Sequence, residues 1–111
     1  MISSALKARR ELGPGFLESI YHASLLIQLR RDGMKADTEK KISVTYTGVE
    51  VGMHRLNLVV DDAVVIELKA VKGFEDAHLA QVLSYLKASG IKTGLLLNFG
   101  GPTLKIKRVV L

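Results

Sequence analysis

The chain has 111 residues, 48% of them hydrophobic and 24% charged, which predicts one globular domain over residues 1–111. It has no cysteine, no apolar run near the roughly 18 residues that span a bilayer, and no secretory signal pattern at its N-terminus. Disulfides, thiolate metal sites and a membrane partner are therefore excluded and a cytoplasmic location is expected, while the net charge of +5 fits either a polyanionic partner or simple solubility.

Two helices are expected in the first third of the chain. Apolar residues recur at helical spacing within residues 3–12, and Gly13-Pro14-Gly15 must interrupt that helix. A second helix is expected from about Phe16 to Arg31, ending before Gly33. Apolar residues cover more than half of the circumference of this second helix, so we expect it to be well buried.

Strand patterns follow, with one more helix among them. Apolar and hydroxyl side chains alternate from Ile42 to Thr47, which is typical of a strand with one solvated face. Residues 51–60 and 63–71 form a predicted hairpin about Asp61-Asp62, a pair that suits a solvated turn. A third helix is expected over residues 75–89, followed by strands over residues 93–99 and 104–111.

The order of these elements predicts the fold class. Two helices, three strands, one helix and two strands (ααβββαββ) indicate an α/β fold of the mixed α+β kind. The passage from strand to helix to a buried apolar strand favours a parallel, right-handed crossover. We therefore expect a mixed sheet of about five strands, an antiparallel meander joined to a parallel strand, with helices packed against it.

The most unusual stretch is Val64–Ala70, where Glu67 and Lys69 interrupt an otherwise apolar strand. Side chains two residues apart on a strand lie on the same face, so the two charged groups point the same way. Burial of an ionised group costs several kcal/mol, of the order of 3 or more, unless it is paired or binds a metal ion. The stretch is therefore either a salt bridge at the end of a strand or part of a functional site.

A hydrolytic site is one interpretation of this pair. Hydrolysis of a phosphodiester needs a divalent cation held by oxygens, an activated water and a positive charge that stabilises the transition state. Glu67 can bind the cation, and Lys69 can orient the water or stabilise the developing charge. A partner ligand should come from the neighbouring strand, where Asn57 stands.

The geometry of the hairpin decides whether Asn57 can join this site. A three-residue loop, or a bulge near Ala63, places Asn57 directly opposite Glu67. A two-residue loop would instead pair Asn57 with Ile66 and leave Asn57 and Glu67 on opposite faces of the sheet. The site hypothesis therefore predicts the longer loop.

Several motifs, taken together, resemble one family. Gly15-Phe16-Leu17-Glu18-Ser19-Ile20-Tyr21 follows the pattern G-x-x-E-x-x-Y, directly after Leu12-Gly13-Pro14. Further matching stretches are Arg55–Asn57, Val65–Ala70, Ala80–Leu86 and Gly94–Phe99. In these motifs the chain resembles the GxxExxY proteins, small bacterial proteins of the PD-(D/E)XK nuclease superfamily. The resemblance implies a three-layer, restriction-endonuclease-like core around a mixed sheet.

The resemblance also implies a set of site residues. In such nucleases an acidic residue on the second core strand and an E-x-K motif on the third form the metal site, here Asn57, Glu67 and Lys69. A Glu on the first core helix and a Gln on the helix after the E-x-K motif often join them, here Glu18 and Gln81. The implied catalytic residues are Lys69, Glu67, Glu18 and Gln81, and the implied metal-binding positions are Glu67, Asn57 and Leu68. The implied cofactor is Mg²⁺ or Mn²⁺ and the implied partner is nucleic acid.

One position departs from the family pattern. The pattern has Asp where this chain has Asn57, and an amide oxygen lacks the negative charge that holds Mg²⁺. The resemblance thus leaves two alternatives, a magnesium-dependent nuclease and a protein that this replacement has inactivated. The second would be a non-catalytic module with the same fold that binds nucleic acid or another protein.

Other candidate residues have structural alternatives as well. Glu18 equally fits a helix N-terminal carboxylate or a partner of His22 one turn later, and Gln81 also fits a polar helix flank. Tyr21 and Tyr85 are expected to be core residues with hydrogen-bonded hydroxyls. Because so short a chain has little surface for reading bases, we expect weak sequence specificity or a homodimer.

Overall fold

The structure is a computed structural model that describes residues 1–111. Its elements are α1 (Ile2–Leu12), α2 (Glu18–Arg31), β1 (Ala36–Tyr46), β2 (Val49–Val60), β3 (Val64–Lys69), α3 (Asp76–Ser89), β4 (Thr93–Asn98) and β5 (Lys105–Val110). The order predicted from the sequence is confirmed. None of the helices has the length and apolar character that a membrane crossing requires.

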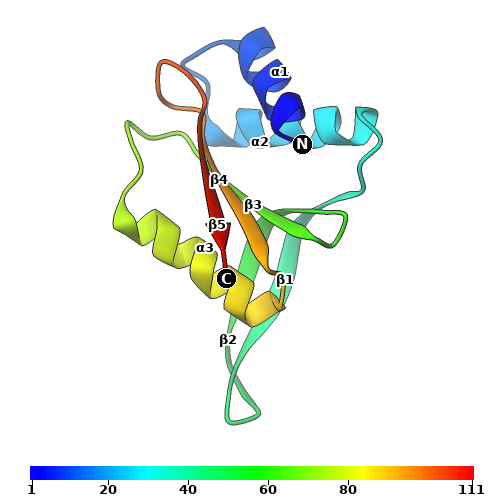
Figure 1. Cartoon of the computed structure of the whole chain (residues 1–111), viewed down its shortest axis with the longest axis vertical. Coiled ribbons are helices and arrows are strands. Elements are labelled where there is room, and N and C mark those ends of the chain that lie inside the picture. Colours follow the sequence, from blue (N-terminus) through cyan, green and yellow to red (C-terminus); the bar gives the residue numbers. More distant parts are fainter.

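The strands form one mixed sheet with the order β1-β2-β3-β4-β5 (Figure 1). β1, β2 and β3 form an antiparallel meander, β4 runs parallel to β3, and β5 runs antiparallel to β4. The parallel pair needs a long connection from one end of the sheet to the other, and α3 provides it. The predicted mixed sheet of five strands is therefore confirmed.

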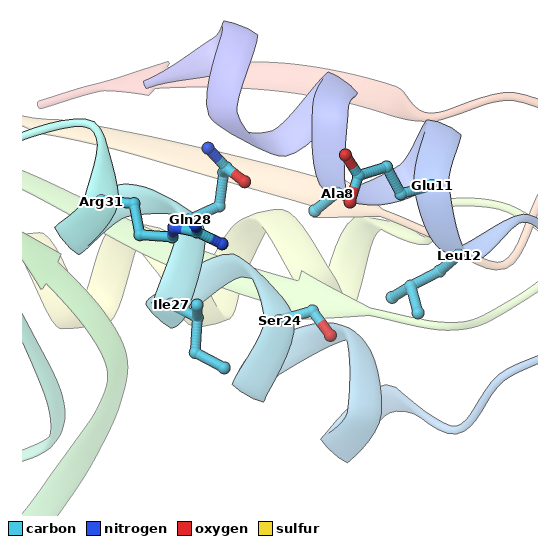
Figure 2. Close-up of a pocket in the computed structure, with 7 residues that line it drawn as sticks. All are labelled: Ala8, Glu11, Leu12, Ser24, Ile27, Gln28 and Arg31. Carbon is cyan, nitrogen blue, oxygen red and sulfur yellow. The ribbon is translucent and has the colours of Figure 1, made fainter.

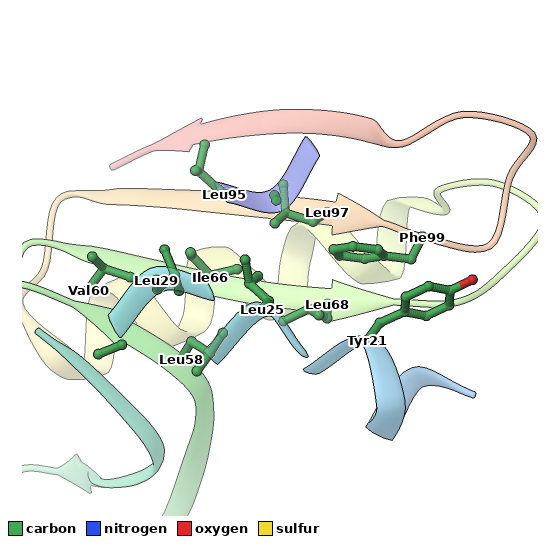
Figure 3. Close-up of a cluster of buried hydrophobic side chains, with 12 residues drawn as sticks. Tyr21, Leu25, Leu29, Leu58, Val60, Ile66, Leu68, Leu95, Leu97 and Phe99 are labelled. Carbon is green, nitrogen blue, oxygen red and sulfur yellow. The ribbon is translucent and has the colours of Figure 1, made fainter. Parts of the chain in front are cut away.

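Helices cover both faces of this sheet. On one face, α1 and α2 pack on a core of twelve buried residues, and Figure 3 shows Tyr21, Leu25 and Leu29 of α2 over the side chains of β2, β3 and β4. On the other face, α3 contributes Val82 and Leu86 to a second core of eight buried residues. The resulting three-layer arrangement is the one expected of a restriction-endonuclease-like fold.

α2 buries less of its surface than its composition predicts. Its buried residues, Tyr21, Leu25 and Leu29, recur every four positions and form a single stripe. Leu17, just before the helix, is 71% exposed and Ile27 is 58% exposed. The expectation of a well-buried helix was wrong, because only one stripe faces the sheet and no further layer of the fold covers the opposite side.

β1 begins earlier than its sequence pattern predicts. The alternation starts at Ile42, but pairing with β2 already starts at Ala36, which lies opposite Val60. The segment between them is mostly polar and carries no strand periodicity. Its extended conformation comes from pairing with the buried end of β2, a tertiary effect that overrides local preference.

A polar clamp joins the carboxyl ends of β3 and β4. The buried Asn98 side chain accepts hydrogen bonds from the backbone N–H of Val71 (3.0 Å) and of Gly100 (3.0 Å), and it donates to the Val71 carbonyl (2.8 Å). A Cβ atom at Gly100 would lie 2.5 Å from the Val71 nitrogen, so this approach requires glycine. The clamp fixes the path of the chain directly after Lys69.

Candidate active site

The turn between β2 and β3 has the longer loop that the site hypothesis predicts. Val60 pairs with Val64, so the loop comprises Asp61, Asp62 and Ala63. Both aspartates adopt left-handed backbone angles, with φ of 53° and 55°, which their short polar side chains tolerate better than most. Continued by one position beyond the last pair, Leu58–Ile66, this register places Asn57 opposite Glu67, as the site hypothesis requires.

The amide of Asn57 replaces the backbone at the point where β2 and β3 separate. The ladder between the two strands ends at the pair Leu58–Ile66. Beyond it, Asn57 Oδ1 accepts a hydrogen bond from the Leu68 backbone N–H at 3.0 Å. A side chain of β2 thus holds the strand that carries the E-x-K motif.

Leu68 can take part in a metal site only through its backbone. Its side chain is fully buried in the core between the sheet and α2. Its N–H points towards β2, and the carbonyl of the same residue in a strand points to the same side. The carbonyl oxygen is therefore the one atom of Leu68 that could contact a metal ion beside Asn57.

Glu67 is a buried carboxylate with an unsatisfied oxygen. The residue is 3% exposed, and its Oε2 atom has no hydrogen-bond partner, a condition shared only with Nε of Arg9. Burial raises the pKa of Glu67 to about 7, and the nearby ammonium of Lys69 opposes this rise. The carboxylates of Glu18 and Glu39 raise the same pKa further, so both lie within electrostatic reach of Glu67.

Lys69 lies on the same face of β3 as Glu67 and makes no ion pair with it. The ion pairs of the structure join Asp62 to Lys35 and to Lys40, in the hairpin region. The simple strand-end salt bridge that the sequence left open is therefore not observed. Lys69 is half-buried and its ammonium is available to other groups.

α3 brings Tyr85 and Gln81 to this face of the sheet. Tyr85 is buried in the core beneath α3, as expected, and its hydroxyl lies beside Glu67. Burial raises the pKa of Tyr85 to about 12, and the negative charge of Glu67 adds to the rise. Gln81 lies one helical turn before Tyr85, on the same side of α3, and its side chain makes no hydrogen bond within the protein.

Glu18 is the first residue of α2, and its neighbours determine where it lies. The expected alternative partner, His22, instead bonds through Nε2 to Thr38 Oγ1 of β1 at 2.9 Å. The Tyr21 hydroxyl donates to the Gly13 carbonyl (2.7 Å) and accepts from the Phe16 N–H (3.3 Å). These contacts fix the loop before α2, and they explain why the motif carries a tyrosine three residues after Glu18.

The surface pockets lie elsewhere. None of the three includes Glu67 or Lys69. The one drawn in Figure 2, of about 320 Å³, lies between α1 and α2. Its lining residues are Ala8, Glu11, Leu12, Ser24, Ile27, Gln28 and Arg31.

The donors around Glu67 suit a cation that keeps much of its water. No three His, Asp or Glu side chains are grouped closely enough to hold a metal ion by themselves. Mg²⁺, however, is usually bound by one or two carboxylates together with waters and substrate phosphates. The unpaired Oε2 of Glu67 supplies one such oxygen, so the residues present fit a hydrated Mg²⁺ better than a cage made only of protein ligands.

Sequence reasoning missed one carboxylate near the site. Glu39 lies in the polar segment of β1 for which no strand was predicted, and no motif singles it out. The signal that reveals it is its place in the hairpin, at the position that matches Asn57. Glu39 also has a left-handed backbone conformation, with φ of 55°.

Comparisons with known proteins identify the family. The model of the PD-(D/E)XK nuclease superfamily matches residues 1–109. The crystal structure of SSO0001 matches with a TM-score of 0.63 and 19% identity, over 83% of this chain and 48% of that one, which shows a shared fold. The chain thus spans about half the length of SSO0001. No curated protein matches. Since the family match covers almost every residue and the fold agrees with it, the chain belongs to the PD-(D/E)XK nuclease superfamily.

Proposed function

We propose that the protein is a metal-dependent nuclease of the GxxExxY type, which hydrolyses phosphodiester bonds of nucleic acid with Mg²⁺ or Mn²⁺. One observation carries the proposal. The buried Oε2 of Glu67 has no partner in the protein, while the neighbouring Lys69 makes no ion pair. A buried carboxylate left unsatisfied beside a free ammonium costs stability, and a ligand that binds both groups accounts for the arrangement.

Each residue of the site has a chemical role in this proposal. Glu67, the Asn57 amide and the Leu68 carbonyl would hold the cation. When bound, the cation would lower the pKa of its water and offset charge on the phosphate. Lys69 would orient the attacking water or stabilise negative charge on the phosphate oxygens. Glu18 and Gln81 would position water at the edge of the site, from α2 and α3.

Nucleic acid as the substrate is supported by charge. The chain carries a net charge of +5, and the edge strand β5 exposes Lys105, Lys107 and Arg108. These cations suit contacts with phosphates, and they also protect an edge strand from pairing with other chains. The two roles differ in salt dependence, because phosphate contacts weaken steeply as the salt concentration rises.

A non-catalytic module is the second candidate, and the environment of Asn57 favours it. The Asn57 amide already accepts a backbone hydrogen bond from β3, so the residue has a structural role that needs no metal ion. A protein that had lost activity could keep this contact and the fold. It would bind nucleic acid or another protein without cleaving a substrate.

A nuclease assay separates the two candidates. We expect weak cleavage of single- or double-stranded DNA or RNA by the native chain with Mg²⁺ or Mn²⁺, and faster cleavage by Asn57→Asp. The gain should vanish when Lys69→Ala is added, and it should vanish in EDTA. If neither the native chain nor Asn57→Asp cleaves any of these substrates, the nuclease proposal fails and the binding module stands.

A further inference from the structure

The position of one strained glutamate suggests how the site makes up for the carboxylate that Asn57 lacks. We propose that Glu39 of β1 is the second acidic ligand of the cation held by Glu67, in place of an acidic residue at position 57. This inference rests on the proposed function, since it concerns the same site. It adds a residue that neither the sequence motifs nor the family pattern indicates.

The register of the β1–β2 hairpin places Glu39 directly opposite Asn57. The flanking pairs are Thr38–Leu58 and Lys40–Leu56. Glu39 and Asn57 themselves form no pair in the ladder, although they occupy matching positions. The ladder is thus locally open at the position where Asn57 turns its amide towards β3.

Both strands bend at this position. Leu56 and Val59 are three residues apart on β2, yet both belong to the core under α3, whereas regular alternation would put them on opposite faces. On β1 the matching irregularity is the left-handed backbone of Glu39, with φ of 55°. The two distortions lie at matching positions, so the irregularity is a property of the strand pair.

The backbone of Glu39 is unfavourable for its residue type. A long side chain rarely adopts a positive φ, and glycine would relieve the strain. Such outliers persist where the surrounding structure imposes them, and they cluster at functional sites. A glutamate at this position therefore indicates that its carboxylate contributes something that glycine would not.

The strand order indicates what that contribution is. β2 lies between β1 and β3, and the two registers place Glu39 and Glu67 on either side of Asn57. Mg²⁺ is commonly bound by one or two carboxylates together with waters, so a cation beside Asn57 suits both side chains. The unpaired Oε2 of Glu67, in a side chain that is almost wholly buried, is an independent sign of the same missing partner.

Calorimetric titration of the full chain with Mn²⁺ tests the proposal without reliance on cleavage. Glu39→Gln keeps the shape and the backbone strain but removes the charge. We expect Glu39→Gln to weaken Mn²⁺ binding roughly tenfold or more, since even residues that only support a metal ligand cost 10–100-fold in affinity. Glu50→Gln, on the same hairpin near its tip, is the matched control and should bind as the native chain does. Circular dichroism of each variant verifies the fold.

A double variant adds a rescue. Glu39→Gln combined with Asn57→Asp moves the carboxylate across the strand pair to the opposite position, and it should restore the affinity of the native chain. A double variant that binds no better than Glu39→Gln alone would overturn the claim that the two positions serve one ion.

Glu67→Gln distinguishes failure of this inference from failure of the proposed function. If Glu67→Gln abolishes binding while Glu39→Gln binds as tightly as the native chain, Glu39 is not a ligand and the proposed function remains. If the native chain binds no Mn²⁺ at all, both proposals fail.

Discussion

Two buried polar side chains on neighbouring strands have opposite surroundings. Asn98, at the end of β4, is 1% exposed and makes three hydrogen bonds to the backbone of Val71 and Gly100. Glu67, on the adjacent β3, is 3% exposed and has an oxygen without any partner. The asparagine is a neutral group whose contacts are complete. The glutamate is an acid whose contacts are not.

The difference separates a structural role from a role in binding. Buried polar groups in folded proteins are nearly always hydrogen-bonded, and each unsatisfied one needs an explanation. Asn98 stabilises the fold by joining two loops, so its removal should cost stability under all conditions. Glu67 destabilises the protein when charged and unliganded, so its neutralisation should stabilise the protein. Variants of the two residues should therefore change stability in opposite directions.

Asn98→Ala should have the largest effect. It leaves the N–H groups of Val71 and Gly100 and the Val71 carbonyl without their partner, which should lower the free energy of unfolding by about 3 kcal/mol. Urea denaturation measures this loss. The comparison variant is Asn57→Ala, which removes one hydrogen bond and should cost about 1 kcal/mol. Equal losses in the two variants would contradict the role of Asn98 as a clamp.

Glu67→Gln should stabilise the protein at pH 8 by about 2 kcal/mol, the next largest effect. The pKa of Glu67 rises from its ordinary 4.5 to about 7 in the folded protein, so the folded state binds more protons than the unfolded state between these values. The contribution of Glu67 to stability is therefore fully present below pH 4.5 and is lost as the pH rises through 7. Glutamine does not titrate, so the difference between variant and native chain should grow over this interval.

Urea denaturation at pH 4.5, 6 and 8, in EDTA, measures this pH dependence. Glu11→Gln, which neutralises an exposed carboxylate on α1, is the control for a general effect of charge. A stabilisation by Glu67→Gln that is the same at all three pH values would show that the effect does not come from titration of Glu67.

Asn57→Asp should lower stability by about 1 kcal/mol in EDTA, because it places a further negative charge opposite Glu67. Addition of Mg²⁺ should remove this penalty, since a ligand that binds only the folded state stabilises it by mass action. The thermal midpoint should therefore rise more with Mg²⁺ in Asn57→Asp than in the native chain. Equal shifts in the two proteins would mean that position 57 does not contact the ion.

Much of the fold follows from local sequence patterns. The Asp61-Asp62 turn, the apolar run from Thr93 to Phe99 and the helix that ends before Gly90 each carry a strong periodicity or a breaker, and the structure has all three. The placement of Glu67 and Lys69 on one face needs only the period of a strand. The three-residue loop was a prediction of the site hypothesis, and it is confirmed.

The position of Glu39 could not be predicted, because it depends on a bulge elsewhere in the hairpin. Tyr46 pairs with Val49 next to the turn, and this register alone would put Glu39 opposite Leu56. One extra residue, Val51, shifts the register between Val44 and Thr45 and brings Glu39 opposite Asn57. Nothing in the local sequence marks Val51 as the extra residue, and a one-residue shift changes every later partner.

Lys69→Met should have the smallest effect and concerns the positive charge that acts on Glu67. The ammonium of Lys69 lowers the pKa of Glu67, against the larger effect of burial. Its removal should therefore raise that pKa further. The rise should be small, because solvent screens a half-buried lysine. A titration of the Glu67 carboxyl carbon by NMR measures the shift directly. The buried side chain of Asn98, whose hydrogen bonds are complete, is the control. Lys69→Met should leave its side-chain amide NMR signals unchanged. If the pKa of Glu67 falls or stays constant, Lys69 does not act on the buried carboxylate, and the assignment of both groups to one site is wrong.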